Sequence, residues 1–129
     1  MTSAGQCIAV IDDEVQVRTA LGRLLRLADY EVAAFGSGEE FLASLMTRRP
    51  DCAILDVHMP GLSGFDVKAR MCAARFEIPV VFITASDDIA LDRAVCEAGG
   101  VTLLRKPFSN DALLDAVGTA LRSNSRGVS

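Results

Sequence analysis

The chain has 129 residues, of which 50% are hydrophobic and 23% are charged, a length that suits one compact domain and a composition that excludes wholesale disorder. Thirteen basic and 17 acidic residues give a net charge of −4. The domain therefore lacks the basic excess that holds a nucleic-acid backbone, and we expect no direct binding of DNA or RNA.

The first half of the chain alternates short apolar runs with amphipathic ones. Residues 7–11 are apolar and end at Asp12, which predicts a buried strand. The next segment has helical spacing, with Arg18, Arg23 and Arg26 mostly outside an apolar face formed by Val17, Ala20, Leu21, Leu24, Leu25 and Ala28. Residues 31–35 predict a second strand. Ser37 and Glu40 then form a capping-box pattern for a helix that runs to about residue 48.

The second half repeats this alternation three times. Apolar runs at 52–55, 80–83 and 101–104 predict three more buried strands. Helices are expected from the loop at 58–64 to about 75, from about 87 to 98, and after a cap at Ser109 or Asn110. Gly99 and Gly100 suit a left-handed helix end.

Five strands that alternate with five helices define an α/β domain. Continuous rather than alternating hydrophobicity indicates strands buried on both faces of a parallel sheet. The simplest arrangement is a doubly wound, flavodoxin-like five-stranded parallel sheet of order 2-1-3-4-5, with helices on both faces.

Polar side chains end four of the five predicted strands. Asp12 and Asp13 follow the first strand, Asp56 the third, Thr84 the fourth and Lys106 the fifth. Ligands of such sheets bind beyond the carboxyl ends of the strands, so these residues are expected to converge. Clustered carboxylates repel one another and favour a hard cation such as Mg²⁺, while a lysine and a hydroxyl suit phosphoryl oxygens. The pattern predicts a site for Mg²⁺ and a phosphoryl group, with a carboxylate available as nucleophile.

Each of these residues alone has a simpler explanation. Adjacent aspartates often begin helices, a single Asp often occupies a turn, and a lone lysine is usually solvated at the surface. The functional interpretation depends on all of them falling at one edge of the sheet.

Four motifs in order resemble the receiver domain of two-component response regulators over about residues 5–122. They are Ile11-Asp12-Asp13-Glu14, Leu55-Asp56-Val57-His58-Met59-Pro60-Gly61, Ile83-Thr84-Ala85 and Lys106-Pro107-Phe108. The resemblance implies a signalling switch with self-catalysed phosphoryl transfer and autodephosphorylation rather than an enzyme.

The resemblance also implies a role for each site residue. Asp56 accepts a phosphoryl group from a sensor histidine kinase, a phosphotransfer protein or acetyl phosphate. Asp13 binds Mg²⁺ directly, Asp12 acts mainly through water, and the His58 carbonyl is a further ligand. The family pattern also implies that Lys106 contacts a phosphoryl oxygen, that Thr84 swings in after phosphorylation, and that the bond between Lys106 and Pro107 is cis.

One position departs from the family pattern, and the only histidine lies in one of the motifs. The family usually has an aromatic residue three positions before the lysine, but this chain has Leu103, which lacks the ring used in the conformational switch. His58 is the only histidine, and its side chain is expected to modulate access or dephosphorylation rather than bind zinc.

Two other classes of function have sequence signals that this chain lacks. Phosphatases and phosphotransferases with an aspartate nucleophile after the first strand carry a DxD pattern, whereas Asp12 and Asp13 are adjacent and are followed by Glu14. A flavin- or nucleotide-binding module of the same fold would have a glycine-rich phosphate loop after the first strand, and this chain has none.

The remaining expectations concern environment and partners. No apolar run approaches the roughly 20 residues that span a bilayer, and the N-terminus is too polar for a secretory signal, so a cytoplasmic protein without membrane contact is expected. The four cysteines are widely spaced, which predicts free thiols packed as small hydrophobic residues.

The resemblance implies an output through a partner or an effector. Residues 5–122 are expected to form the receiver and 123–129 a polar tail or the start of a linker. Phosphorylation is expected to favour a homodimer or partner docking through the fourth helix, fifth strand and fifth helix. The fifth-strand ending also resembles transcriptional regulators that carry a helix-turn-helix domain.

Overall fold

The computed structural model describes residues 5–128, without the side chains of 124–128. Five strands and five helices alternate along the chain, as the hydrophobic pattern predicts. The strands are β1 Cys7–Ile11, β2 Glu31–Phe35, β3 Cys52–Asp56, β4 Val80–Thr84 and β5 Thr102–Arg105. The helices are α1 Val15–Leu27, α2 Gly38–Ser44, α3 Gly64–Ala73, α4 Ala90–Glu97 and α5 Asn110–Val128.

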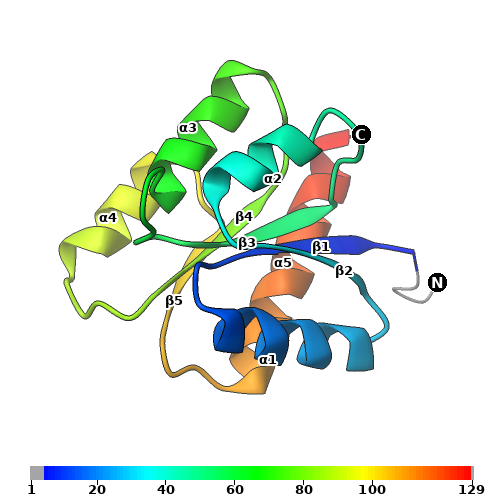
Figure 1. The fold of residues 1–129 in the computed structure, drawn as a ribbon, viewed down its shortest axis with the longest axis horizontal. Helices are drawn as coiled ribbons and strands as arrows, with labels where there is room; N and C mark the ends of the chain where they lie inside the picture. The colour runs from blue at the N-terminus through cyan, green and yellow to red at the C-terminus, as the bar shows by residue number, and fades with distance from the viewer. Residues whose placement is uncertain (1–4, 129) are drawn as a thin grey trace.

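The strands form one parallel sheet of order β2-β1-β3-β4-β5. Figure 1 shows α1 and α5 on one face of the sheet and α2, α3 and α4 on the other. The doubly wound, flavodoxin-like fold predicted from the sequence is therefore confirmed. This order brings the carboxyl ends of β1 and β3 side by side at the switch point, where polar residues follow both strands.

The sheet separates two hydrophobic clusters, because successive strand residues point to opposite faces. Ile8 and Val10 of β1 pack with Leu25 of α1 and with α5. Ala9 and Ile11 pack in the other cluster, which includes residues of α2, α3 and α4. Burial on both faces explains why β1, β3 and β4 are almost continuously apolar, whereas the edge strands β2 and β5 are less buried.

Three helices begin at serines whose hydroxyls accept a backbone N–H three residues on. Ser37 accepts from Glu40 at 3.1 Å, as the capping pattern predicts, and Ser109 accepts from Ala112 at 3.0 Å. Both halves of a capping box are present at Ser63 and Asp66, at the start of α3. These bonds satisfy N–H groups that a helix leaves without internal partners.

Helices α2 and α4 are shorter than expected. Helix α2 ends at Ser44 rather than near residue 48. Beyond it, backbone N–H groups donate to the carbonyl three residues earlier, as Leu45 does to Leu42, and these tighter turns interrupt the α-helix. Helix α4 begins at Ala90 rather than near residue 87, because the Asp88 carboxylate accepts from the Ala90 N–H and holds a turn.

Three predictions of burial are wrong. The strand expected to be buried at 101–104 is only half-buried, because β5 lies at an edge of the sheet. Ala20 is exposed, so the apolar stripe of α1 is narrower than expected. All four cysteines are free, but only Cys7 and Cys52 are buried, whereas Cys72 and Cys96 are exposed. The latter two lie on α3 and α4, each of which covers the sheet with one side only.

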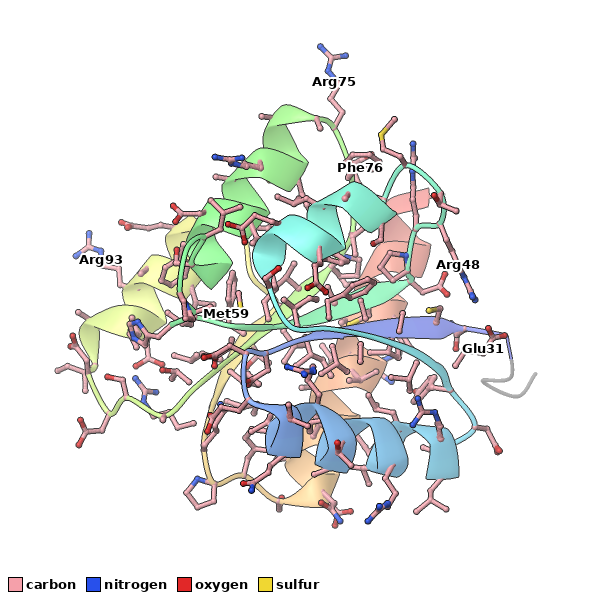
Figure 2. All side chains as sticks on the ribbon, viewed as in Figure 1. Glu31, Arg48, Met59, Arg75, Phe76 and Arg93 are labelled. Atoms are coloured by element: carbon pink, nitrogen blue, oxygen red, sulfur yellow. The ribbon has the colours of Figure 1, made fainter. Side chains whose placement is uncertain are left out.

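Helix α5 extends to Val128, across a segment where a polar tail or linker is expected. Arg48, after α2, donates to Glu31 at the start of β2 at 2.6 Å, and both side chains lie at the same end of the sheet in Figure 2. In the described part of the chain, no helix combines the length and hydrophobicity needed to cross a membrane.

Candidate functional site

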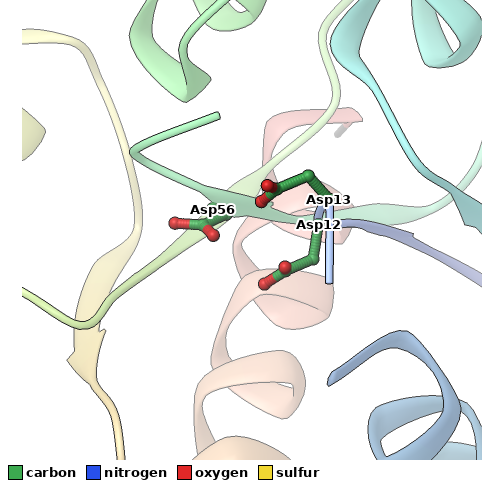
Figure 3. Close-up of side chains that lie close together, drawn as sticks. All are labelled: Asp12, Asp13 and Asp56. Atoms are coloured by element: carbon green, nitrogen blue, oxygen red, sulfur yellow. The ribbon is translucent and has the colours of Figure 1, made fainter. Parts of the chain in front are cut away.

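Three carboxylates converge at the carboxyl ends of β1 and β3. Oxygen atoms of Asp12, Asp13 and Asp56 lie within 4.8 Å of one another, and Figure 3 shows the three side chains around one small space. Asp12 and Asp56 are buried, with 0% and 5% of their surface exposed, whereas Asp13 is exposed. The predicted convergence of these residues is confirmed.

The backbone fixes Asp56 at the end of β3. Its Oδ1 accepts from the His58 N–H at 3.1 Å, while the side chain of His58 is exposed. The start of α3 lies directly behind it, since a Cβ on Gly64 would collide with the Asp56 carbonyl. Glycine is therefore required where α3 approaches the strand end.

Lys106 brings a positive charge into this pocket from the end of β5. Its Nζ lies 3.0 Å from Asp12 Oδ2 and 3.4 Å from Asp56 Oδ2, with 18% of the side chain exposed. Burial lowers the pKa of Lys106, but its hydrogen bond to Asp12 and the attraction of Asp56 outweigh this effect, so that the pKa is raised. The lysine remains an ammonium between two carboxylates.

Asp56 titrates differently from an ordinary aspartate. Burial and the charge of Asp12 raise its pKa, against the opposing effects of Lys106 and the His58 N–H, to about 6. At neutral pH the carboxylate is mostly ionised, and it retains a negative charge that one ammonium does not fully balance. This arrangement fits a hard cation, because all the available donor atoms are oxygens.

Thr84 ends β4 beside these groups and is fully buried. Its hydroxyl accepts from the Ser86 N–H at 3.1 Å. The peptide bond between Lys106 and Pro107 is cis, as the family resemblance implies, and the Lys106 N–H donates to the Thr84 carbonyl at 2.7 Å. The ends of β4 and β5 are thus tied together next to the pocket.

Two residues of the site have contacts that the sequence did not predict. Glu14 donates its N–H to Asp12 Oδ1 at 2.9 Å and places a carboxylate oxygen 3.5 Å from Lys106 Nζ. Arg18, expected on the polar side of α1, donates to the Asp12 carbonyl at 2.7 Å. The acidic run that includes Glu14 is a visible signal, whereas nothing in the local pattern distinguishes Arg18 from its neighbouring arginines.

Comparison with known proteins identifies the family. Residues 8–118 match the model of the response regulator receiver domain. Nodulation protein W of Bradyrhizobium diazoefficiens is 40% identical over 110 residues, which cover 85% of this chain and 48% of that protein. The transcriptional regulatory protein FixJ of the same organism is 35% identical over 122 residues, which cover 95% of this chain and 59% of that protein.

The solved structures agree with this assignment. Full-length FixJ from B. japonicum superposes with a TM-score of 0.89 at 32% identity, covering 97% of this chain and 62% of that one. The chain thus spans about half the length of the curated relatives named above. Such a domain is a signalling module rather than a classical enzyme. The sequence match, the sheet order and the acidic pocket agree, and the chain belongs to the response regulator receiver domain family.

Proposed function

We propose that the domain is a phosphorylation switch in which Asp56 accepts a phosphoryl group from a histidine kinase or phosphotransfer protein, or from acetyl phosphate. The observation that supports this most directly is the group of three carboxylates whose oxygens lie within 4.8 Å, two of them bridged by the Lys106 ammonium. A carboxylate oxygen of Asp56 attacks phosphorus and forms an O–P bond. The P–N bond of the phosphohistidine breaks, and the imidazole leaves with the electron pair.

The other site residues prepare this transfer. Asp13 would hold Mg²⁺ directly, Asp12 through water, and Asp56 and the His58 carbonyl would add ligands. When bound, Mg²⁺ supplies positive charge that offsets the charge of the phosphoryl oxygens. Lys106 would turn from its carboxylate partners to one of those oxygens, and the Thr84 hydroxyl would leave the Ser86 N–H to hydrogen-bond another.

The proposed output is a shift between two conformations. Inward movement of Thr84 vacates space towards β5, where Leu103 is half-buried against the cluster beneath α4. We infer that this leucine follows by repacking rather than by turning a ring, and that phosphorylation favours a homodimer or a partner on the face formed by α4, β5 and α5.

The relatives support a proposal for the setting of this switch. FixJ is named a transcriptional regulatory protein and is longer than this chain. We propose that residues 5–122 act as the receiver of a cytoplasmic two-component system that controls transcription through an effector or a partner, and that the segment from Ser123 on leads away from it. The receiver itself would make no contact with DNA.

Incubation with acetyl phosphate and Mg²⁺, followed by intact mass measurement, tests the proposal. We expect one phosphate per chain, lost in base, and no adduct in Asp56→Asn. Asp66→Asn is a matched control, because that aspartate caps α3 outside the pocket. An adduct of equal yield in Asp56→Asn, or multiple turnover on phosphate esters without Asp56, would contradict the proposed function.

A further inference from the structure

The guanidinium of Arg18 reaches back from α1 to the end of β1. Its Nη1 donates to the backbone carbonyl of Asp12 at 2.7 Å, and the side chain is half-buried. Asp12 lies just beyond the last residue of β1, so a side chain rather than a neighbouring strand is the donor to this carbonyl. Charged donors make stronger hydrogen bonds than neutral ones.

With this contact, Asp12 is held at four atoms. Its N–H donates to the Phe35 carbonyl at 3.2 Å. Its two carboxylate oxygens accept from the Glu14 N–H at 2.9 Å and from Lys106 Nζ at 3.0 Å. Arg18 contributes the remaining contact, to the carbonyl. The residue is therefore fixed from β2, from the start of α1 and from the end of β5.

The Asp12 carbonyl belongs to the peptide group that joins Asp12 to Asp13. Because that group is planar, holding its oxygen also fixes the Asp13 nitrogen and Cα, the atom from which the Asp13 side chain leaves the backbone. In Figure 3 the Asp13 carboxylate is directed towards Asp56. Asp13 is exposed, so its orientation depends on the backbone more than on surrounding side chains.

The loop after β2 leaves room for the guanidinium. A Cβ on Gly36 would lie 3.3 Å from Arg18 Nη1, which is tighter than an ordinary contact. The φ of Gly36 lies outside the left-handed region, so alanine is compatible with the backbone there. Gly36→Ala should thus displace the Arg18 guanidinium by a few tenths of an ångström without touching the acidic pocket.

We propose that Arg18 is a positioning residue, which acts through the peptide group between Asp12 and Asp13 to aim the Asp13 carboxylate for Mg²⁺. This inference rests on the proposed function, because it takes Asp13 to be a metal ligand. Loss of a residue that orients a ligand typically weakens metal binding by about 10- to 100-fold. We expect the lower end of that range, because Asp12 retains its three other contacts.

Calorimetric titration with Mg²⁺ alone tests the inference. We expect about tenfold weaker binding in Arg18→Gln, partial recovery in Arg18→Lys, and a smaller loss in Gly36→Ala. Arg23→Gln removes the same charge from an exposed position of the same helix and should bind like the wild type. Thermal unfolding in chelator would show how much stability each variant has lost.

A second readout separates positioning from general loss of structure. Initial rates of phosphorylation by acetyl phosphate, measured against Mg²⁺ concentration, should need about tenfold more Mg²⁺ for half-maximal rate in Arg18→Gln. The rate at saturating Mg²⁺ should match that of the wild type. A variant that merely contained less folded protein would show a lower maximal rate with an unchanged requirement for Mg²⁺, which would overturn the inference.

The possible failures are distinguishable. If the wild type does not bind Mg²⁺ in the millimolar range, the proposed function itself is wrong, and the role of Arg18 falls with it. If the wild type binds but Arg18→Gln and Gly36→Ala bind equally well, only the positioning role is wrong. If Arg18→Gln does not fold, equal affinities in Arg18→Lys, Gly36→Ala and the wild type would refute it.

Discussion

Replacement of the buried acceptor carboxylate should stabilise the metal-free domain. The pKa of Asp56 is raised from 3.8 to about 6, first by burial and then by the charge of Asp12. A difference of about 2 pKa units corresponds to about 3 kcal/mol, since each unit is worth about 1.4 kcal/mol. Asp56→Asn removes the charge and keeps an oxygen that can accept from the His58 N–H. We therefore expect a gain in unfolding free energy of about 2–3 kcal/mol at pH 8.

The stability cost of the Asp56 charge depends on pH. The folded state binds the Asp56 proton more tightly than the unfolded chain, so ionisation costs stability above pH 6. This cost disappears as the pH falls from 6 towards 4, because the carboxyl becomes protonated in the folded protein. The stability difference between Asp56→Asn and the wild type should shrink over the same interval.

Urea unfolding in chelator at pH 8, 6 and 4 measures the stability difference between Asp56→Asn and the wild type. The melting temperatures of the two proteins should differ by roughly 6–10 °C at pH 8. Added Mg²⁺ should raise the stability of the wild type and have less effect on the variant. A variant that is less stable than the wild type at pH 8, or whose advantage does not change with pH, would refute the electrostatic reasoning.

Other substitutions probe the start of α3 and its contact with the acceptor strand. Ser63→Ala should lose about 1 kcal/mol in urea unfolding with an unchanged m value, because the Asp66 N–H loses its cap. Asp66→Asn should also be less stable than the wild type near neutral pH. Hydrogen bonds with Ser63 lower the pKa of Asp66, so the stability difference between this variant and the wild type should fade as the pH falls through that pKa. Gly64→Ala should reduce both the stability of the domain and the phosphorylation of Asp56, because the new Cβ would collide with the Asp56 carbonyl. Gly118→Ala is the control. Its Cβ would meet only Arg122 Nη1, at 3.4 Å, so this variant should fold and react normally. Equal behaviour of the two alanine variants would contradict the close approach of α3 to the strand end.

The sheet was predictable because its sequence signal is strong. The three central strands are buried on both faces and are therefore almost entirely apolar, and the polar residues that end them are visible as abrupt changes. The convergence of Asp12, Asp56 and Lys106 then follows from strand order, since parallel strands present their carboxyl ends at one edge. These parts of the site required no knowledge of side-chain conformations.

The helices were less predictable because their limits depend on competition between local contacts. Helical spacing in the sequence continues beyond Ser44 and before Ala90. At the first position tighter turns replace the α-helical hydrogen bonds, and at the second the Asp88 side chain accepts from the Ala90 N–H instead. Spacing also fails to predict that Ala20 is exposed while Arg18 turns inward. Long charged side chains can cover buried surface and still reach a polar partner, so their positions on a helical wheel do not settle their contacts.

The two exposed thiols offer a means of observing the domain in solution. The chain has no tryptophan, so it carries no indole reporter of its own. Cys96 lies exposed on α4, one of the elements of the face proposed to bind a partner on phosphorylation, and Cys72 lies exposed on α3 as a reference point. Because Cys7 and Cys52 are buried, maleimide dyes or spin labels would react selectively with the thiols of Cys72 and Cys96. A pair of labels on the native thiols could therefore report relative movement of α3 and α4 without any engineered cysteine.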